Sequence, residues 1–243
     1  MTELITMHTH STFCNHAKDP LGDMVQAAVD AGIAHMAATE HYPIPDELDP
    51  SKRSTMPAER LEAYVDAVRE QQRRDDIDVL LGCELDWLGK DETRALHASD
   101  FDRFDVVLGS IHFVDRWLMV SHKHMSRWKS VDLEAFWNRY VELWCEAAKS
   151  DMPFTVMAHA DVVKKFSPKP EFDLEPLYER MARAAREGGR MVEVNTSGAY
   201  AECAEYYPSP SLLQAFRAEG VACTVGTDAH CKEHIARDIE RAY

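Results

Sequence analysis

The chain has 243 residues, of which 45% are hydrophobic, so it can bury one core as a single domain spanning residues 1–243. Its formal net charge of −15 at pH 7 repels polyphosphate backbones and therefore disfavours a nucleic-acid-binding function. No apolar run reaches the ~20 residues of a membrane span and the N-terminal segment MTELITMHTH lacks a signal-peptide pattern, which predicts a cytoplasmic protein without a membrane partner.

Seven short apolar segments recur along the chain and predict β-strands. Their length and their almost continuous apolar character are typical of parallel strands that are buried on both faces. The expected strands cover residues 4–8, 33–39, 79–85, 105–111, 154–158, 191–195 and 221–227.

Amphipathic helices are expected between these strands. Asp19-Pro20 and Ser209-Pro210 each place a capping side chain directly before a proline at the first helical position. The clearest helix covers residues 133–144, where apolar residues recur at steps of three and four. Seven strand–helix units in succession imply an α/β fold with a parallel sheet, and the lack of an obvious edge strand favours a closed or nearly closed barrel.

Six of the seven expected strands end in residues that can bind a metal ion. His8 and His10 stand two residues apart, so both side chains point to one face of an extended strand, and Asp228 and His230 repeat this spacing. Imidazole and carboxylate ligands suit zinc, manganese or iron, and a carboxylate such as Glu84 can bridge two ions. The candidate ligands are His8, His10, His16, His41, Glu84, His112, His159, Asp228 and His230.

These residues, in this order, resemble the PHP (polymerase and histidinol phosphatase) family, and in particular its histidinol-phosphatase branch, over nearly the whole chain. The resemblance rests on the segments MHTHSTFCNHA, ATEHYPIP, GCELDW, GSIHF, AHADVVKKF, EVNTSG and GTDAH. It implies a distorted (β/α)7 barrel that holds two to three divalent ions. By the family pattern, one ion would be held by His8, His10, Glu84 and Asp228, a second by Glu84, His112 and His159, and a third by His16, His41 and His230.

The resemblance also implies a metal-dependent phosphatase that hydrolyses L-histidinol phosphate to L-histidinol and phosphate in histidine biosynthesis. Glu84 and Asp228 would then be catalytic residues, because they hold the ions that activate water and stabilise charge on the phosphoryl group. The leaving alcohol needs a proton, for which Asp161 and a metal-bound water are both candidates.

One position departs from the family pattern, which has an arginine two residues after the Asn195-Thr196-Ser197-Gly198 turn. Here that residue is Tyr200, and a tyrosine donates a hydrogen bond but carries no charge. Lys164 and Lys165 lie where the family has a second cation that contacts phosphate. The expected substrate-binding residues are therefore Lys164, Lys165 and Tyr200, and the loop cations Arg53 and Arg116 are further candidates.

Three alternative functions follow from the same residues. Tyr200 is compatible with a PHP phosphoesterase that acts on a different small phosphate ester. A nuclease or a proofreading domain is opposed by the net charge of −15, and a non-catalytic metal-binding module is opposed by the complete set of ligands. The pattern of residues carries no indication of the oligomeric state.

Overall fold

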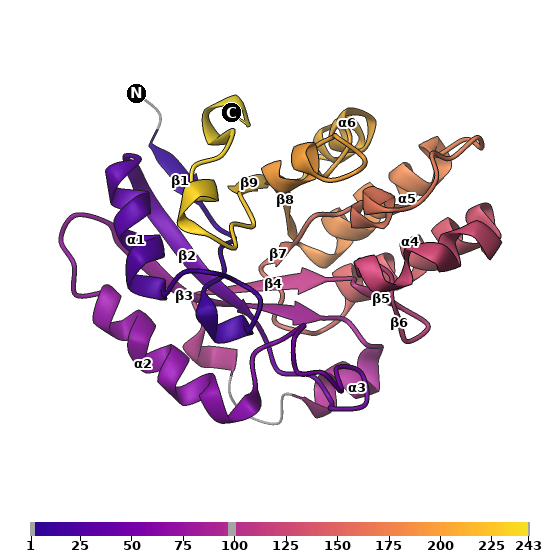
Figure 1. Cartoon of the computed structure of the whole chain (residues 1–243). Coiled ribbons are helices and arrows are strands. Elements are labelled where there is room, and N and C mark those ends of the chain that lie inside the picture. Colours follow the sequence, from indigo (N-terminus) through magenta and orange to yellow (C-terminus); the bar gives the residue numbers. More distant parts are fainter. Residues whose placement is uncertain (1–2, 97–100, 243) are drawn as a thin grey trace.

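The computed structural model describes residues 3–96 and 101–242. Within these residues, one parallel sheet has seven strands in the spatial order β1-β2-β3-β4-β7-β8-β9, which is also their order along the chain (Figure 1). The strands are β1 (Leu4–Thr6), β2 (Ile33–His41), β3 (Asp78–Asp86), β4 (Val106–Ser110), β7 (Val156–Met157), β8 (Met191–Asn195) and β9 (Cys223–Gly226). All seven predicted strands are confirmed, with bounds that differ by a few residues.

The first and last strands meet, so that the sheet forms a nearly closed barrel, as predicted. The backbone N–H of Met7 donates to the carbonyl of Val225 over 2.8 Å, and the N–H of His10 donates to the carbonyl of Ala229 over 2.8 Å. Because these bonds lie near or just beyond the carboxyl ends of β1 and β9, closure brings together the pairs His8/His10 and Asp228/His230 that follow the two strands.

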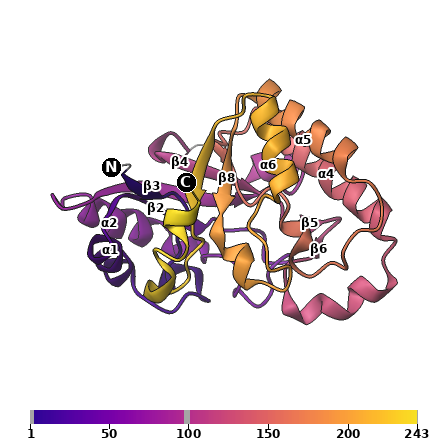
Figure 2. The same ribbon diagram turned by 90° about the horizontal axis from the view of Figure 1, so that it is seen from above.

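Helices cover the outside of the barrel in two groups. They are α1 (Leu21–Asp30), α2 (Leu61–Gln71), α3 (Lys90–Ala95), α4 (Leu133–Lys149), α5 (Glu175–Gly188) and α6 (Pro210–Ala218). Helices α1 and α2 lie beside the first three strands, whereas α4, α5 and α6 form a layer on the opposite side (Figures 1 and 2). Within the described residues, no helix has the length and apolar character that crossing a membrane requires.

The two predicted capping residues behave differently. Ser209 accepts a hydrogen bond from the first turn of α6, as predicted. Asp19 does not cap α1, because the N-cap residue is Pro20 and the Asp19 carboxylate accepts a hydrogen bond of 3.0 Å from the backbone N–H of Lys232 instead. This prediction was wrong because a contact with the distant C-terminal segment competes for the same carboxylate.

Apolar side chains of the strands alternate between the barrel interior and the helix layers. Val106 and Leu108 of β4 pack inside against Ala37 and Val156, whereas Val107 packs outward into the larger core beneath α4 and α5. The interior cluster is small, and many of the buried side chains at the carboxyl ends of the strands are polar. This end of the barrel is therefore available for chemistry.

A hairpin that the sequence did not predict follows the fourth parallel strand. Its strands are β5 (Phe113–Val114) and β6 (Trp117–Leu118), and the turn residues Asp115 and Arg116 have φ angles of 46° and 62°. Two successive positive φ values are typical of a tight hairpin turn, but this turn lacks the Asn-Gly or Asp-Gly pair by which it is recognised in a sequence. The hairpin begins one residue after His112 and flanks the ligand cluster.

Candidate metal centre

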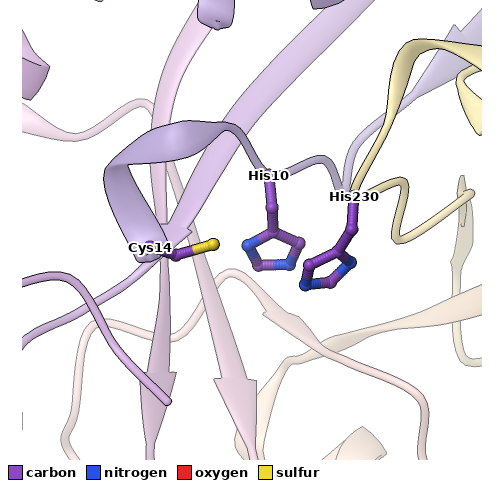
Figure 3. Close-up of side chains that lie close together, drawn as sticks. All are labelled: His10, Cys14 and His230. Atoms are coloured by element: carbon purple, nitrogen blue, oxygen red, sulfur yellow. The ribbon is translucent and has the colours of Figure 1, made fainter. Parts of the chain in front are cut away.

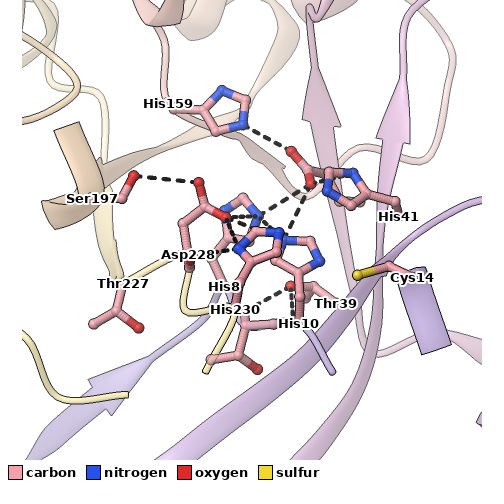
Figure 4. A network of polar contacts seen from close by, with 12 residues as sticks. His8, His10, Cys14, Thr39, His41, His159, Ser197, Thr227, Asp228 and His230 are labelled. Atoms are coloured by element: carbon pink, nitrogen blue, oxygen red, sulfur yellow. Dashed lines mark hydrogen bonds and ion pairs between the residues drawn. The ribbon is translucent and has the colours of Figure 1, made fainter. Parts of the chain in front are cut away.

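All nine predicted ligands lie together at the carboxyl end of the barrel. Figure 4 labels His8, His10, His41, His159, Asp228 and His230 among them. Seven of them line a cavity of about 420 Å³, whereas His8 and His10 lie fully buried beneath its floor. The ligands come from segments up to 222 residues apart in the chain. Parallel strands deliver their carboxyl ends to one place, and this geometry explains why ligands so distant in sequence converge.

A first cluster joins His8, His10, Glu84 and Asp228. The two imidazole Nε2 atoms are 3.0 Å apart. Glu84 Oε2 is 3.3 Å from His8 Nε2, and Asp228 Oδ1 is 3.2 Å from His10 Nε2. Four ligands at ~2.1 Å around one tetrahedral ion lie ~3.4 Å from each other, so these atoms have a spacing that suits a single ion.

A second cluster uses the other oxygen of the same glutamate. Glu84 Oε1 is 2.8 Å from His159 Nε2 and 3.5 Å from His112 Nε2, and these two imidazole nitrogens are 3.3 Å apart. Ser110 Oγ donates to Glu84 Oε1 over 2.6 Å and holds the carboxylate in this orientation. Glu84 therefore presents one oxygen to each cluster, as a bridging ligand would.

A third cluster lies nearer the cavity mouth and contains His16, His41 and His230. The Nε2 atoms of His16 and His230 are 2.9 Å apart. His41 also lies close to the first cluster, because its Nδ1 is 2.9 Å from Glu84 Oε2. The three clusters therefore form one continuous group of ligand atoms.

Hydrogen bonds place a proton on the Nδ1 atoms of three ligand imidazoles. His8 Nδ1 lies 2.9 Å from Glu193 Oε1, and His112 Nδ1 lies 3.0 Å from Asp86 Oδ1. His16 Nδ1 faces a backbone carbonyl oxygen in the same way. Since a carboxylate or a carbonyl can only accept, each Nδ1 carries a proton, and in the neutral imidazole each Nε2 then presents a lone pair to a metal ion.

This arrangement fits a bound cation. His8 Nε2 and His10 Nε2 are 3.0 Å apart and both lie within 3.4 Å of Glu84 Oε2, so three potential ligand atoms surround one small space. Glu84 Oε2 is buried and forms no hydrogen bond of good geometry with the described residues, although ring nitrogens of His8, His10 and His41 lie 2.9 to 3.4 Å from it. A divalent ion bound at each cluster would compensate the buried carboxylate charge and explain why the ligand nitrogens lie so close together.

The ionisation of the ligands also suits metal binding. Burial opposes ionisation of Glu84, but the surrounding imidazoles hold its pKa well below the usual range, and the same holds for the pKa of Asp228. Burial together with neighbouring imidazoles lowers the pKa of His10 and lowers the pKa of His16 to about 3. At neutral pH the carboxylates are therefore charged and these imidazoles are neutral, which are the forms that bind metals.

Two carboxylates that support the ligands were missed by the sequence analysis. Glu193 accepts from His8 Nδ1 and also accepts the backbone N–H of His159 over 2.8 Å. Asp86 supports His112 in the same way. Glu193 fits because a Cβ at Gly226 would lie only 1.9 Å from its Oε1. The sequence feature that could have identified Glu193 is its position as a charged residue within the largely apolar strand β8.

Two ligands have backbone conformations that are rare for residues with a side chain. The φ angle is 23° at His159 and 49° at Asp228, whereas residues other than glycine strongly prefer negative values. Strained backbone of this kind is retained where the surrounding structure demands it, and it is concentrated at functional sites.

Cys14 lies near the first and third clusters, with its Sγ close to ligand atoms of His10 and His230 (Figure 3). Its thiol donates to the carbonyl of Ser11 over 3.3 Å, and burial raises the pKa of the thiol. Burial therefore favours the neutral thiol form of Cys14, which packs against the ligands.

Lys164 and Asp161 form an internal ion pair and do not line the cavity. Lys164 Nζ donates to Asp161 Oδ2 over 2.9 Å and to Glu205 Oε2 over 2.7 Å. Burial raises the pKa of Asp161, and Lys164 opposes this effect. The role of Asp161 as a proton donor stays a prediction, and this position gives it no direct access to a substrate in the cavity.

Lys165 lines the cavity and Tyr200 does not. The Lys165 ammonium lies 5.5 Å from the centre of the Phe166 ring. Tyr200 is 54% exposed, and the guanidinium of Arg237 lies 3.8 Å from the centre of its ring. Of the two further cations named from the sequence, Arg53 lines the cavity, whereas Arg116 pairs with Glu92 outside it over 2.7 Å.

Comparisons with known proteins agree with this architecture. Residues 6–197 match the PHP domain family model. A protein of Deinococcus radiodurans named "Probable histidinol-phosphatase" is 31% identical over 95% of this chain and 87% of its own length.

Solved structures show the same fold. HisK of Listeria monocytogenes, a candidate histidinol phosphatase, superimposes with a TM-score of 0.87 at 20% identity, covering 98% of this chain and 99% of its own. Histidinol phosphate phosphatase of Lactococcus lactis, solved with zinc, L-histidinol and phosphate, gives a TM-score of 0.77 at 20% identity over 99% of this chain and 94% of its own. The barrel, its converging ligands and the family match over 6–197 lead to one conclusion: the chain belongs to the PHP domain family.

Proposed function

We propose that this protein is a metal-dependent phosphomonoesterase that hydrolyses L-histidinol phosphate to L-histidinol and phosphate. The observation that carries the proposal is the position of Glu84, whose two oxygens face two separate sets of imidazoles. The similarity to the Deinococcus protein supports the choice of substrate. In this proposal, residues 1–243 act as one catalytic domain.

The three clusters would hold two to three divalent ions, of zinc, manganese or iron. His8, His10, Glu84 and Asp228 would hold the first, Glu84, His112 and His159 the second, and His16, His41 and His230 the third. Such ions would lower the pKa of water toward neutrality and stabilise charge on the phosphoryl oxygens. The contribution of the chain is to keep Glu84 and Asp228 ionised and to hold the imidazoles in the ligating tautomer.

The cavity suits a small phosphate ester. Its volume of about 420 Å³ lies in the usual range for small-molecule sites. Phe113, Leu118 and Val120, from the hairpin and the segment that follows it, form an apolar part of its wall. We expect the alcohol part of the ester to contact these residues while the phosphate faces the ligand clusters.

Elemental analysis tests the number of ions. We expect two to three zinc, manganese or iron ions per chain after reconstitution and removal of excess metal, because the ligand atoms form three clusters. A value of one ion or none in correctly folded protein would contradict the proposal.

A steady-state comparison tests the substrate. We expect the highest kcat/KM for histidinol phosphate in a panel of phosphomonoesters assayed with metal-analysed protein. Tyr200 stands where the family pattern has an arginine, which favours one alternative, a PHP phosphatase for a different small ester. A markedly higher kcat/KM for another ester in the panel would select that alternative.

The neighbouring lysines should differ in function. Lys165→Ala should lower kcat/KM by about tenfold, because it removes a cation that lines the cavity. Lys164→Ala should instead lower the melting temperature, because it removes the cation from the buried Asp161 carboxylate and leaves the backbone N–H of Ser209 as a donor to it. Thermal denaturation and steady-state kinetics on both variants provide the comparison. Equal kinetic effects of the two substitutions at unchanged stability would contradict this division.

A further inference from the structure

The cations that face the cavity are few. Among the described residues that line it, the basic side chains apart from histidine are Arg53 and Lys165, and the acidic ones are Glu84, Asp86 and Asp228. Arg53 follows β2 and Lys165 follows β7, and two other strands separate β2 from β7 in the sheet. The two cations therefore approach the cavity from different segments of its rim.

Arg53 differs from neighbouring loop cations in its lack of a carboxylate partner. Lys52 Nζ lies 3.4 Å from Asp46 Oδ1, and Arg116 is paired with Glu92. In the part of the chain that the structure describes, Arg53 forms no ion pair. Its guanidinium is available to an anion in the cavity.

The backbone on both sides of Arg53 is anchored to the ligand-bearing segments. Asn15 Nδ2 donates to the carbonyl of Lys52 over 2.8 Å, and Asn15 directly precedes a candidate ligand. Three residues after Arg53, the N–H of Met56 donates to the carbonyl of the ligand His41 over 3.0 Å. Arg53 is therefore held at a defined place beside the third cluster.

The residue that replaces the family arginine cannot supply a charge. The guanidinium of Arg237 lies over one face of the Tyr200 ring, which is otherwise exposed. Thr196 Oγ1 donates to the carbonyl of Arg237 over 2.8 Å, so this contact is anchored to the turn. Neither Tyr200 nor Arg237 lines the cavity.

We propose that Arg53 binds the phosphate group of the substrate and supplies the cationic contact that is missing after the Asn195-Thr196-Ser197-Gly198 turn. The inference rests on the proposed phosphatase function. A guanidinium keeps its charge at all relevant pH values and can donate two parallel hydrogen bonds to phosphate oxygens. The contact comes from the loop after the second strand instead of the turn after the sixth parallel strand.

The test compares Arg53→Gln, Arg53→Lys and the matched control Lys52→Gln, which removes a charge from the adjacent position of the same loop. All proteins are zinc-loaded and their metal content is measured. Calorimetric titration with inorganic phosphate gives binding without turnover, and steady-state kinetics give kcat/KM. We expect Arg53→Gln to weaken phosphate binding and kcat/KM by ~10- to 100-fold at unchanged zinc content, with partial recovery in Arg53→Lys. Lys52→Gln should stay within about twofold of the wild type.

The outcomes separate this inference from the proposed function. Wild-type phosphate affinity in Arg53→Gln, or an equal loss in Lys52→Gln, would overturn the role of Arg53. If the wild-type protein hydrolyses no phosphomonoester but binds phosphate in an Arg53-dependent manner, the proposed function fails while Arg53 is still supported as the phosphate-binding residue.

Discussion

Replacing Glu84 with glutamine is expected to lower kcat by about two to three orders of magnitude while the fold persists. Glutamine keeps the shape of the side chain but removes the negative charge that the two clusters share. Its amide nitrogen cannot bind a cation, so only one cluster at a time could keep an oxygen from this position. The loss should therefore include both metal content and turnover.

The control for this prediction is Glu92→Gln, which removes an exposed carboxylate that pairs with Arg116. It should retain wild-type kcat and metal content, because exposed ion pairs contribute little. Circular dichroism and thermal denaturation would establish that both variants are folded. A folded Glu84→Gln protein with nearly wild-type turnover and metal content would show that Glu84 does not bridge two ions.

The barrel and its ligands could be predicted from sequence because both depend on local patterns. Each buried strand is a short apolar segment, and each ligand follows or ends its strand. Parallel strands in one barrel bring their carboxyl ends together, so position in the local pattern was enough to place His8, Glu84 and Asp228 at one end of the barrel, whereas their assignment to one ion came from the family resemblance. The distances between their ligand atoms agree with this prediction.

The surroundings of the site depend on contacts that local patterns do not encode. Lys164 and Lys165 are adjacent in the short 3₁₀ segment after β7, yet one pairs internally with Asp161 and the other lines the cavity. The hairpin turn at Asp115 and Arg116 carries no recognisable turn sequence. The positions of the two lysines and of the hairpin turn depend on loop conformation. Loop conformation in turn depends on tertiary contacts with distant segments of the chain.

Glu193 shows the same limit, since its function is visible only through its partners. Its Oε1 accepts from His8 Nδ1 over 2.9 Å, and its Oε2 accepts from the backbone N–H of His159 over 2.8 Å. One carboxylate thus orients a ligand of the first cluster and the backbone of a ligand of the second cluster. Such supporting residues commonly change metal affinity when they are replaced.

Glu193→Gln is expected to reduce zinc affinity by ~10- to 100-fold. The N–H of His159 can only donate, so the amide oxygen of the introduced glutamine has to remain beside it, and the amide nitrogen then faces His8 Nδ1. His8 would have to accept at Nδ1 and carry its proton on Nε2, which blocks the atom that faces the first cluster. Competition with a chelator measures the affinity, and histidine nitrogen NMR reports the tautomer of His8. Saturating zinc should restore much of the activity of Glu193→Gln, as expected for a positioning residue. The control Glu187→Gln replaces an exposed glutamate and should keep the zinc affinity and activity of the wild type. Unchanged zinc affinity with an unchanged His8 tautomer would show that Glu193 does not orient this ligand.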